Sequence, residues 1–174
     1  PEAQRPKIVV FGESLGSFGG EAPFLSPNNI IARTNGALFS GPTFQNTMWE
    51  DVTVNRDPGS PMWLPIFDDG RNVRLAARPE NLGRPDKPWG NPRIVYLQHA
   101  SDPVVWWSPD LVFERPDWLK EPPGFDRSPS MRWYPIVTFW QVGADMASNV
   151  TSSAASPVGH GHSYGDNQLD GWVA

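Results

Sequence analysis

Three short apolar runs, each followed at once by small or polar residues, predict the strands of this chain. They lie at residues 7–11 (Lys-Ile-Val-Val-Phe), 36–40 (Gly-Ala-Leu-Phe-Ser) and 93–98 (Arg-Ile-Val-Tyr-Leu-Gln). Apolar runs without polar alternation are typical of strands that are buried on both faces of a parallel sheet. We therefore expect the β-branched run at 7–11 to be covered on both faces.

The segments between these runs predict helices. Residues 28–33 follow the helix start signal Ser26-Pro27, and residues 46–56 form a second candidate helix. Residues 131–147 are apolar nearly all round, and we expect a buried helix there, with a strand as the alternative because the segment contains Pro and β-branched residues. Strands that alternate with helices predict an α/β fold with a mostly parallel sheet flanked by helices.

Residues 57–92 differ from the rest of the chain in composition. They are rich in Pro, Gly, Asp and Arg, which favour turns and irregular connections. We interpret this stretch as an irregular insertion that holds at most one hairpin, with arms at 63–67 and 73–76. The length of 174 residues suits one domain, so residues 1–174 are interpreted as a single domain.

Composition and charge exclude several classes of function. The 14 basic and 19 acidic residues give a net charge of −5, which argues against a nucleic-acid binder. The absence of Cys excludes a disulfide scaffold, a zinc–cysteine site and a thiol nucleophile. With only three His residues, we expect no metal and no cofactor. No run approaches the roughly 20 apolar residues that a membrane span needs.

The first strand leads without a spacer into Gly12-Glu13-Ser14-Leu15-Gly16. Gly-x-Ser-x-Gly after a strand is the pattern of a nucleophile elbow, in which a serine sits on a strained strand-to-helix turn and glycines allow close backbone contact. The pattern occurs again around Ser163, but no predicted strand precedes that copy. Ser14 is therefore the candidate nucleophile, and the N–H of Leu15 is one candidate oxyanion donor.

An elbow serine needs a base, and the base needs a carboxylate that orients it. Asp102 lies just past the end of the 93–98 strand, where the active-site loops of such sheets gather. Its alternative role is to begin an Asp-Pro turn. Asp110, Asp117 and Asp145 lie further along the chain in less suitable contexts, and Asp69 is interpreted as a turn residue.

Three histidines are candidates for the base. His99 precedes Asp102 and so violates the chain order Ser, acid, His, which favours a structural or pocket-lining role. His160 and His162 lie in a Gly-rich loop near the end of the chain, where the order places the base. We favour His162 and keep His160 as the alternative; a loop histidine bonded to nearby carbonyls is the structural explanation for either.

Three blocks of the sequence resemble one particular family. They are Val-Phe-Gly-Glu-Ser-Leu-Gly-Ser-Phe-Gly-Gly-Glu (10–21), Tyr-Leu-Gln-His-Ala-Ser-Asp-Pro-Val-Val-Trp-Trp-Ser-Pro (96–109) and Gly-His-Gly-His-Ser-Tyr-Gly (159–165). The chain resembles the α/β-hydrolase catalytic domain of actinobacterial membrane-associated proteins, which join an N-terminal multi-span region to this domain. The resemblance implies Ser14 as nucleophile, Asp102 as acid, a His of the 160–162 pair as base, and a cell-envelope setting.

The resemblance has one departure that bears on the organisation of the protein. α/β-Hydrolases have several strands before the elbow, including a loop that donates the second oxyanion N–H, whereas about ten residues precede the elbow here. We therefore expect 1–174 to be the C-terminal portion of the fold, with the upstream half of the same protein, including a membrane region, as its partner. The segment itself is expected to be soluble.

Together these features predict a serine hydrolase that cleaves a carboxylic ester, of small-molecule or lipid-like character, without nucleic acid as a partner. Two alternatives stay open. One is acyl transfer with the same triad, in which an alcohol replaces water at the acyl-enzyme. The other is a non-catalytic module of a membrane protein that keeps the elbow sequence.

Overall fold

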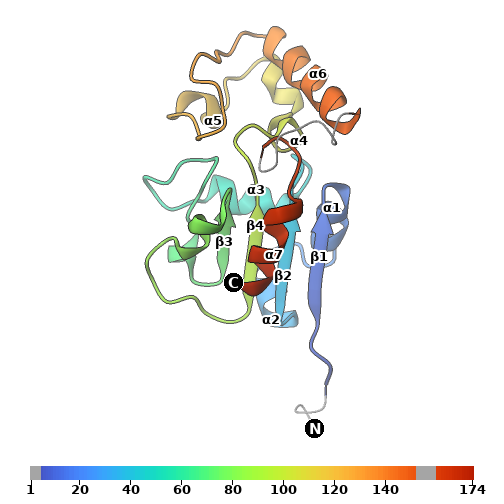
Figure 1. Cartoon of the computed structure of the whole chain (residues 1–174), viewed down its shortest axis with the longest axis vertical. Coiled ribbons are helices and arrows are strands. Elements are labelled where there is room, and N and C mark those ends of the chain that lie inside the picture. The colour runs from blue at the N-terminus through green and yellow to red at the C-terminus, as the bar shows by residue number, and fades with distance from the viewer. Residues whose placement is uncertain (1–4, 152–159) are drawn as a thin grey trace.

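A computed structural model describes residues 5–151 and 160–174, and a four-stranded sheet lies at its centre (Figure 1). The strands are β1 (Val9–Glu13), β2 (Gly36–Ser40), β3 (Val73–Ala76) and β4 (Arg93–Leu97). Their order in the sheet is β1-β2-β4-β3, and every neighbouring pair is parallel. The expected α/β class with a parallel sheet is confirmed.

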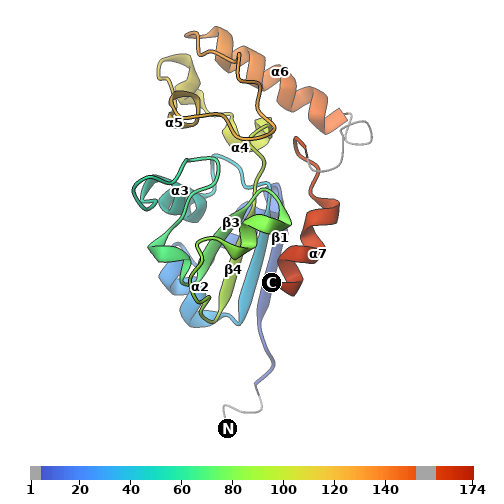
Figure 2. The same cartoon turned by 60° about the vertical axis from the view of Figure 1, so that its left-hand side comes forward.

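Helices cover both faces of the sheet. The short helix α1 (Leu15–Glu21) leaves directly from β1; α2 (Pro27–Arg33) and α3 (Thr47–Val54) pack on one face, and α7 (Gly165–Val173) covers the other (Figure 2). On β2, Phe39 belongs to the cluster under α2 and α3, whereas Leu38 belongs to the cluster under α7. Both faces of the central strands are buried because successive side chains point to opposite sides.

A further group of helices lies beyond the carboxyl ends of the strands (Figure 1). It comprises α4 (Pro103–Trp106), α5 (Asp117–Lys120) and α6 (Val137–Thr151), and Trp106 packs on Trp118 with ring centroids 5.7 Å apart. Short 3-10 turns complete the described part of the chain: η2 (Asp68–Gly70), η3 (Pro79–Gly83) and η4 (Pro109–Val112). None of the described helices is long and apolar enough to cross a membrane.

The expectation that the first strand is covered on both faces is wrong. β1 begins at Val9 rather than at residue 7, and it forms one edge of the sheet. The side chains of Val9 and Phe11 are 57% and 48% exposed. Among the described residues, no strand pairs with the outer edge of β1, and Trp172 of α7 covers Phe11 only in part.

Two other expectations need correction. The 131–147 segment does form a helix, α6, but its start is shifted to Val137 and its outer face is exposed, with Trp140 69% accessible. The 57–92 stretch is not irregular throughout, because it supplies β3, which pairs in parallel with β4. The expected hairpin is reduced to a single antiparallel bridge between Ile66 and Arg74.

Candidate active site

Ser14 links β1 directly to α1 in a strained backbone conformation. Its φ is 53° and its ψ is −123°, and a positive φ is uncommon for a residue with a side chain. A Cβ at Gly12 would come within 2.3 Å of the Gly16 carbonyl oxygen, so this position requires glycine. A Cβ at Gly16 would meet open space. Close contact between backbone segments therefore explains the glycine at position 12 of the motif but not the one at position 16.

Asp102 and His162 are in contact at the carboxyl end of the sheet. His162 Nδ1 donates to Asp102 Oδ2 over 2.8 Å, and the Asp102 side chain has no solvent exposure. The other oxygen of Asp102 accepts the backbone N–H of Val104 at 2.8 Å, which caps α4. Asp102 can therefore both orient His162 and begin the turn at Pro103, because Oδ2 contacts the imidazole and Oδ1 accepts the backbone N–H.

Tyr164 adds a donor to the same carboxylate, a contact that the sequence analysis missed. Its hydroxyl donates to Asp102 Oδ2 at 2.6 Å and accepts the backbone N–H of His99 at 3.2 Å. The Tyr164 ring also stacks on the His99 ring, with centroids 4.4 Å apart and planes 8° apart. The only sequence signal was an aromatic residue two positions after the candidate base.

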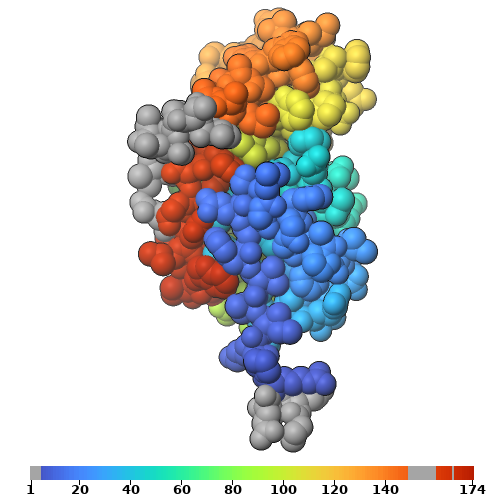
Figure 3. Space-filling model, turned by 90° about the vertical axis from the view of Figure 1, so that its right-hand side faces the viewer, coloured from blue at the N-terminus to red at the C-terminus, as the bar shows by residue number. Residues whose placement is uncertain are grey.

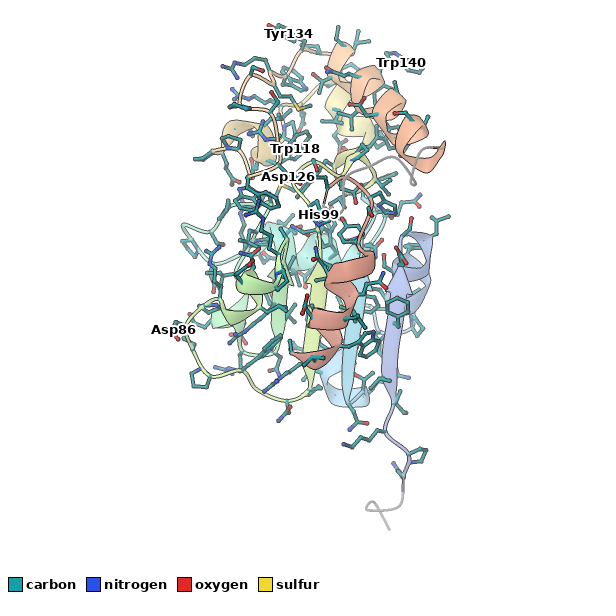
Figure 4. All side chains as sticks on the ribbon, in the orientation of Figure 1. Asp86, His99, Trp118, Asp126, Tyr134 and Trp140 are labelled. Atoms are coloured by element: carbon teal, nitrogen blue, oxygen red, sulfur yellow. The ribbon has the colours of Figure 1, made fainter. Side chains whose placement is uncertain are left out.

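The loop that carries His162 is anchored to the segment after β4. The N–H of Gly161 donates to Ser101 Oγ at 2.9 Å, and its carbonyl accepts from His99 Nδ1 at 2.8 Å. Ser101 in turn donates from its hydroxyl to Asp126 Oδ2 at 2.6 Å. Figure 4 shows His99 at the upper end of the sheet and Asp126 above it. These bonds fix the backbone from which the imidazole of His162 projects.

Ser14 and His162 are both adjacent to the residues that end β2. The N–H of Ser14 donates to the Ser40 carbonyl at 2.8 Å. The next residue, Gly41, has a φ of 56°, and a Cβ there would lie 2.5 Å from His162 Cε1. Among the described hydrogen bonds, none joins the Ser14 hydroxyl to His162. Hydrogen bonds between a nucleophile and its base are often long or poorly aligned before substrate binds.

The partly buried His162 and the fully buried His99 have opposite shifts in pKa. Burial lowers the pKa of His162, but the hydrogen bond and charge of Asp102 and the charge of Glu13 outweigh it, so its pKa is raised. Burial also lowers the pKa of His99, and there the contact with the Gly161 carbonyl compensates only in part. His99 is therefore suited to a neutral structural role, and His162 to accepting a proton.

The other candidates take no part in the contact between Asp102 and His162. The His160 ring is 6.1 Å from the Phe125 ring, and no described hydrogen bond joins it to Asp102. Ser163 has no positive φ and follows a turn rather than a strand. Asp117 pairs with Arg56 and Lys120, and Asp69 pairs with Lys87. Asp110 lies in η4 and Asp145 in α6.

The arrangement supplies a strained serine, an imidazole whose pKa is raised, and a buried carboxylate that orients it. Nucleophile–base–acid triads are built from these three residue types. Among residues 5–151 and 160–174, no group of three or more His, Asp or Glu side chains is placed to hold a metal ion.

Comparison with known protein families gives a match over the whole chain. The model of a family described as the alpha/beta-hydrolase family matches residues 1–174, the whole chain. Neither the curated proteins nor the solved structures gave a match.

Proposed function

Because the chain belongs to the alpha/beta-hydrolase family, we propose that it is a serine hydrolase that cleaves a carboxylic ester through an acyl-enzyme. The family supports hydrolase activity, and the choice of serine chemistry rests on one observation. The backbone N–H of the strained Ser14 donates to the carbonyl of Ser40, the last residue of β2. The imidazole of His162, which is paired with Asp102, lies against Gly41, the residue after Ser40.

In the proposed reaction, the Ser14 hydroxyl attacks the acyl carbonyl while His162 Nε2 accepts its proton. His162 then returns that proton to the departing alcohol, and water repeats the sequence to release the acid. Asp102 keeps the Nδ1–H of His162 oriented and stabilises the imidazolium. The N–H of Leu15 donates to the oxyanion, with a second donor from outside the described residues. This chemistry needs no cofactor.

We propose that the ester is lipid-like. An apolar groove of about 400 Å³ follows α6, and its lining is Trp107, Phe139, Trp140, Gly143, Ala144 and Met146. The Trp107 ring also packs on the ring of Phe44, with centroids 5.2 Å apart. Phe44 lies three residues after Gly41, the glycine in contact with His162. An apolar groove that contacts the segment after β2 through Phe44 supports an acyl chain as the bound part of the substrate.

The proposal is tested by labelling the complete natural polypeptide with a fluorophosphonate and assaying p-nitrophenyl esters of increasing acyl length. We expect stoichiometric labelling at Ser14 and a rate that rises with chain length. Product analysis with an added alcohol distinguishes hydrolysis from acyl transfer. A chain that folds but is neither labelled nor active would support a non-catalytic module instead.

The raised pKa of His162 predicts the pH dependence of the reaction. The base acts in its neutral form, so kcat/KM falls as the pH drops through its folded-state pKa, which lies above the ordinary 6.5. We expect the acid limb of the profile to have its midpoint above pH 6.5. In Asp102→Asn, the charge that raises the pKa of the imidazole most is removed while burial still lowers it, so the midpoint of the residual activity moves downward. An unmoved midpoint would contradict the pairing.

The exposed edge of the sheet supports a second proposal. Ile8, Val9 and Phe11 are each about half exposed, and Phe11 contacts only Trp172 of α7 among the described aromatic rings. Figure 3 shows β1 and α1 at the surface of this face. Exposed apolar edges are liable to aggregate. We propose that an upstream strand of the same polypeptide pairs with β1, and that the whole protein is a membrane-associated envelope enzyme of the actinobacterial type.

If this is so, residues 1–174 expressed alone are expected to be about 10²–10³-fold less active, since one oxyanion donor is lost. The measurement compares p-nitrophenyl ester turnover per labelled serine for 1–174 with and without the upstream region. Restoration by the upstream half added in trans would support the pairing. Equal turnover in the two forms would contradict it.

A further inference from the structure

A chain of buried polar side chains lies beneath the elbow and has no part in the proposed triad. Ser17 Oγ donates to the Ser14 carbonyl at 2.6 Å, and Asn46 Nδ2 donates to Ser17 Oγ at 3.0 Å. The same amide nitrogen donates to Glu21 Oε1 at 2.9 Å. Ser17 and Asn46 are fully buried and Glu21 is 2% exposed. Such burial is costly unless every polar group is satisfied.

The direction of each hydrogen bond in this chain is determined. Asn46 Oδ1 accepts both the N–H and the hydroxyl of Thr43, each at 2.9 Å, so its NH₂ group must face Ser17 and Glu21. Glu21 accepts further bonds from the Tyr96 hydroxyl at 2.7 Å and the Met48 N–H at 3.1 Å. Burial raises the pKa of Glu21, and the bonds from Asn46 and Tyr96 oppose that rise. A group surrounded by donors is satisfied as a carboxylate.

The Ser14 carbonyl at the end of this chain belongs to the same rigid peptide unit as the Leu15 N–H. The two groups of a trans peptide point in opposite directions. The carbonyl accepts from the Ser17 hydroxyl and also from the Ser17 N–H at 2.9 Å, which keeps it turned toward the interior. The Leu15 N–H is therefore turned the other way, and as the first residue of α1 it has no acceptor within the helix.

We propose that Glu21, Asn46 and Ser17 form a positioning relay that holds the Ser14–Leu15 peptide so that its N–H points at the oxyanion. The proposal rests on the proposed serine hydrolase function. Glu21 fixes the amide of Asn46, Asn46 fixes the hydroxyl of Ser17, and Ser17 fixes the peptide. None of the three touches substrate, so they act through the backbone alone.

The test is Ser17→Ala in the complete natural polypeptide, with Thr53→Val as the matched control. Thr53 is also fully buried and also donates its hydroxyl to a carbonyl three residues earlier, that of Glu50 at 3.0 Å, but it lies at the far end of α3. Removal of a whole oxyanion donor costs about 10²–10³ in rate, so a misoriented one is expected to lower kcat about 10- to 100-fold. We expect KM to change less than twofold and Thr53→Val to keep wild-type kcat at a similar loss of Tm.

Glu21→Gln serves as the second variant, because it keeps the shape of the side chain but places an NH₂ group among donors. We expect a fall in kcat in the same direction with KM unchanged. The relay is overturned if Ser17→Ala loses no more kcat than Thr53→Val, or if the loss lies in KM. An unreactive wild-type Ser14 toward both ester and fluorophosphonate would overturn the hydrolase proposal and the relay together, so the two failures are distinguishable.

Discussion

Ser14→Ala is expected to abolish fluorophosphonate labelling and to reduce ester turnover to background, whereas Ser163→Ala keeps most of the wild-type activity. Both serines lie within a Gly-x-Ser-x-Gly pattern, but only Ser14 follows a strand and has a positive φ. The strained turn lies at the carboxyl end of the sheet, where the candidate base also lies, and alanine leaves no nucleophile there.

The matched pair of serine variants makes this prediction specific. Ser163 lies next to the candidate base and shares its loop, so its replacement controls for general disturbance of the site. Turnover is measured with a p-nitrophenyl ester, and folding is checked by circular dichroism of each variant. If Ser163→Ala lost labelling and Ser14→Ala kept it, the nucleophile would be assigned to the wrong copy of the motif.

The α/β class with a parallel sheet was predictable from the sequence, because the strands and helices that define it leave signals in local composition. The apolar runs of β2 and β4 and the helix start at Ser26-Pro27 are visible within short windows. Periodicity does not distinguish a central strand from an edge strand, which is why β1 was expected to be covered. It also does not tell which side of an apolar helix is packed, and α6 buries Val142 while exposing Trp140.

The candidate site was predictable where a short motif or the chain order specified it. Ser14 and Asp102 have such signals, and their roles remain predictions. His160 and His162 are two residues apart in one Gly-rich loop, so the sequence does not tell which imidazole faces Asp102. Only the tertiary structure shows that it is His162. The contacts of Tyr164 with Asp102 and of Glu21 with Tyr96 span 62 and 75 residues. No local pattern encodes contacts at that separation.

Asp102→Asn and His162→Ala are each expected to lower kcat by about 10⁴-fold or more, as losses of triad members do in other hydrolases. The cause is the 2.8 Å bond between the two side chains. Asparagine at 102 can present an NH₂ group to Nδ1 and so select the wrong tautomer. His160→Ala is the matched control and should retain most activity, because His160 lies against Phe125.

The losses of kcat in Asp102→Asn and His162→Ala should not add to the loss of kcat in Ser14→Ala. The rate effects of substitutions at residues that act as one unit are far from additive, since removal of any member leaves the others without a reaction to assist. We therefore expect Ser14→Ala combined with either Asp102→Asn or His162→Ala to be no slower than Ser14→Ala alone, within a factor of about two. The measurement is kcat for a p-nitrophenyl ester in all single and double variants. Multiplicative losses would mean that the three side chains act independently, and a larger loss in His160→Ala than in His162→Ala would transfer the role of base to His160.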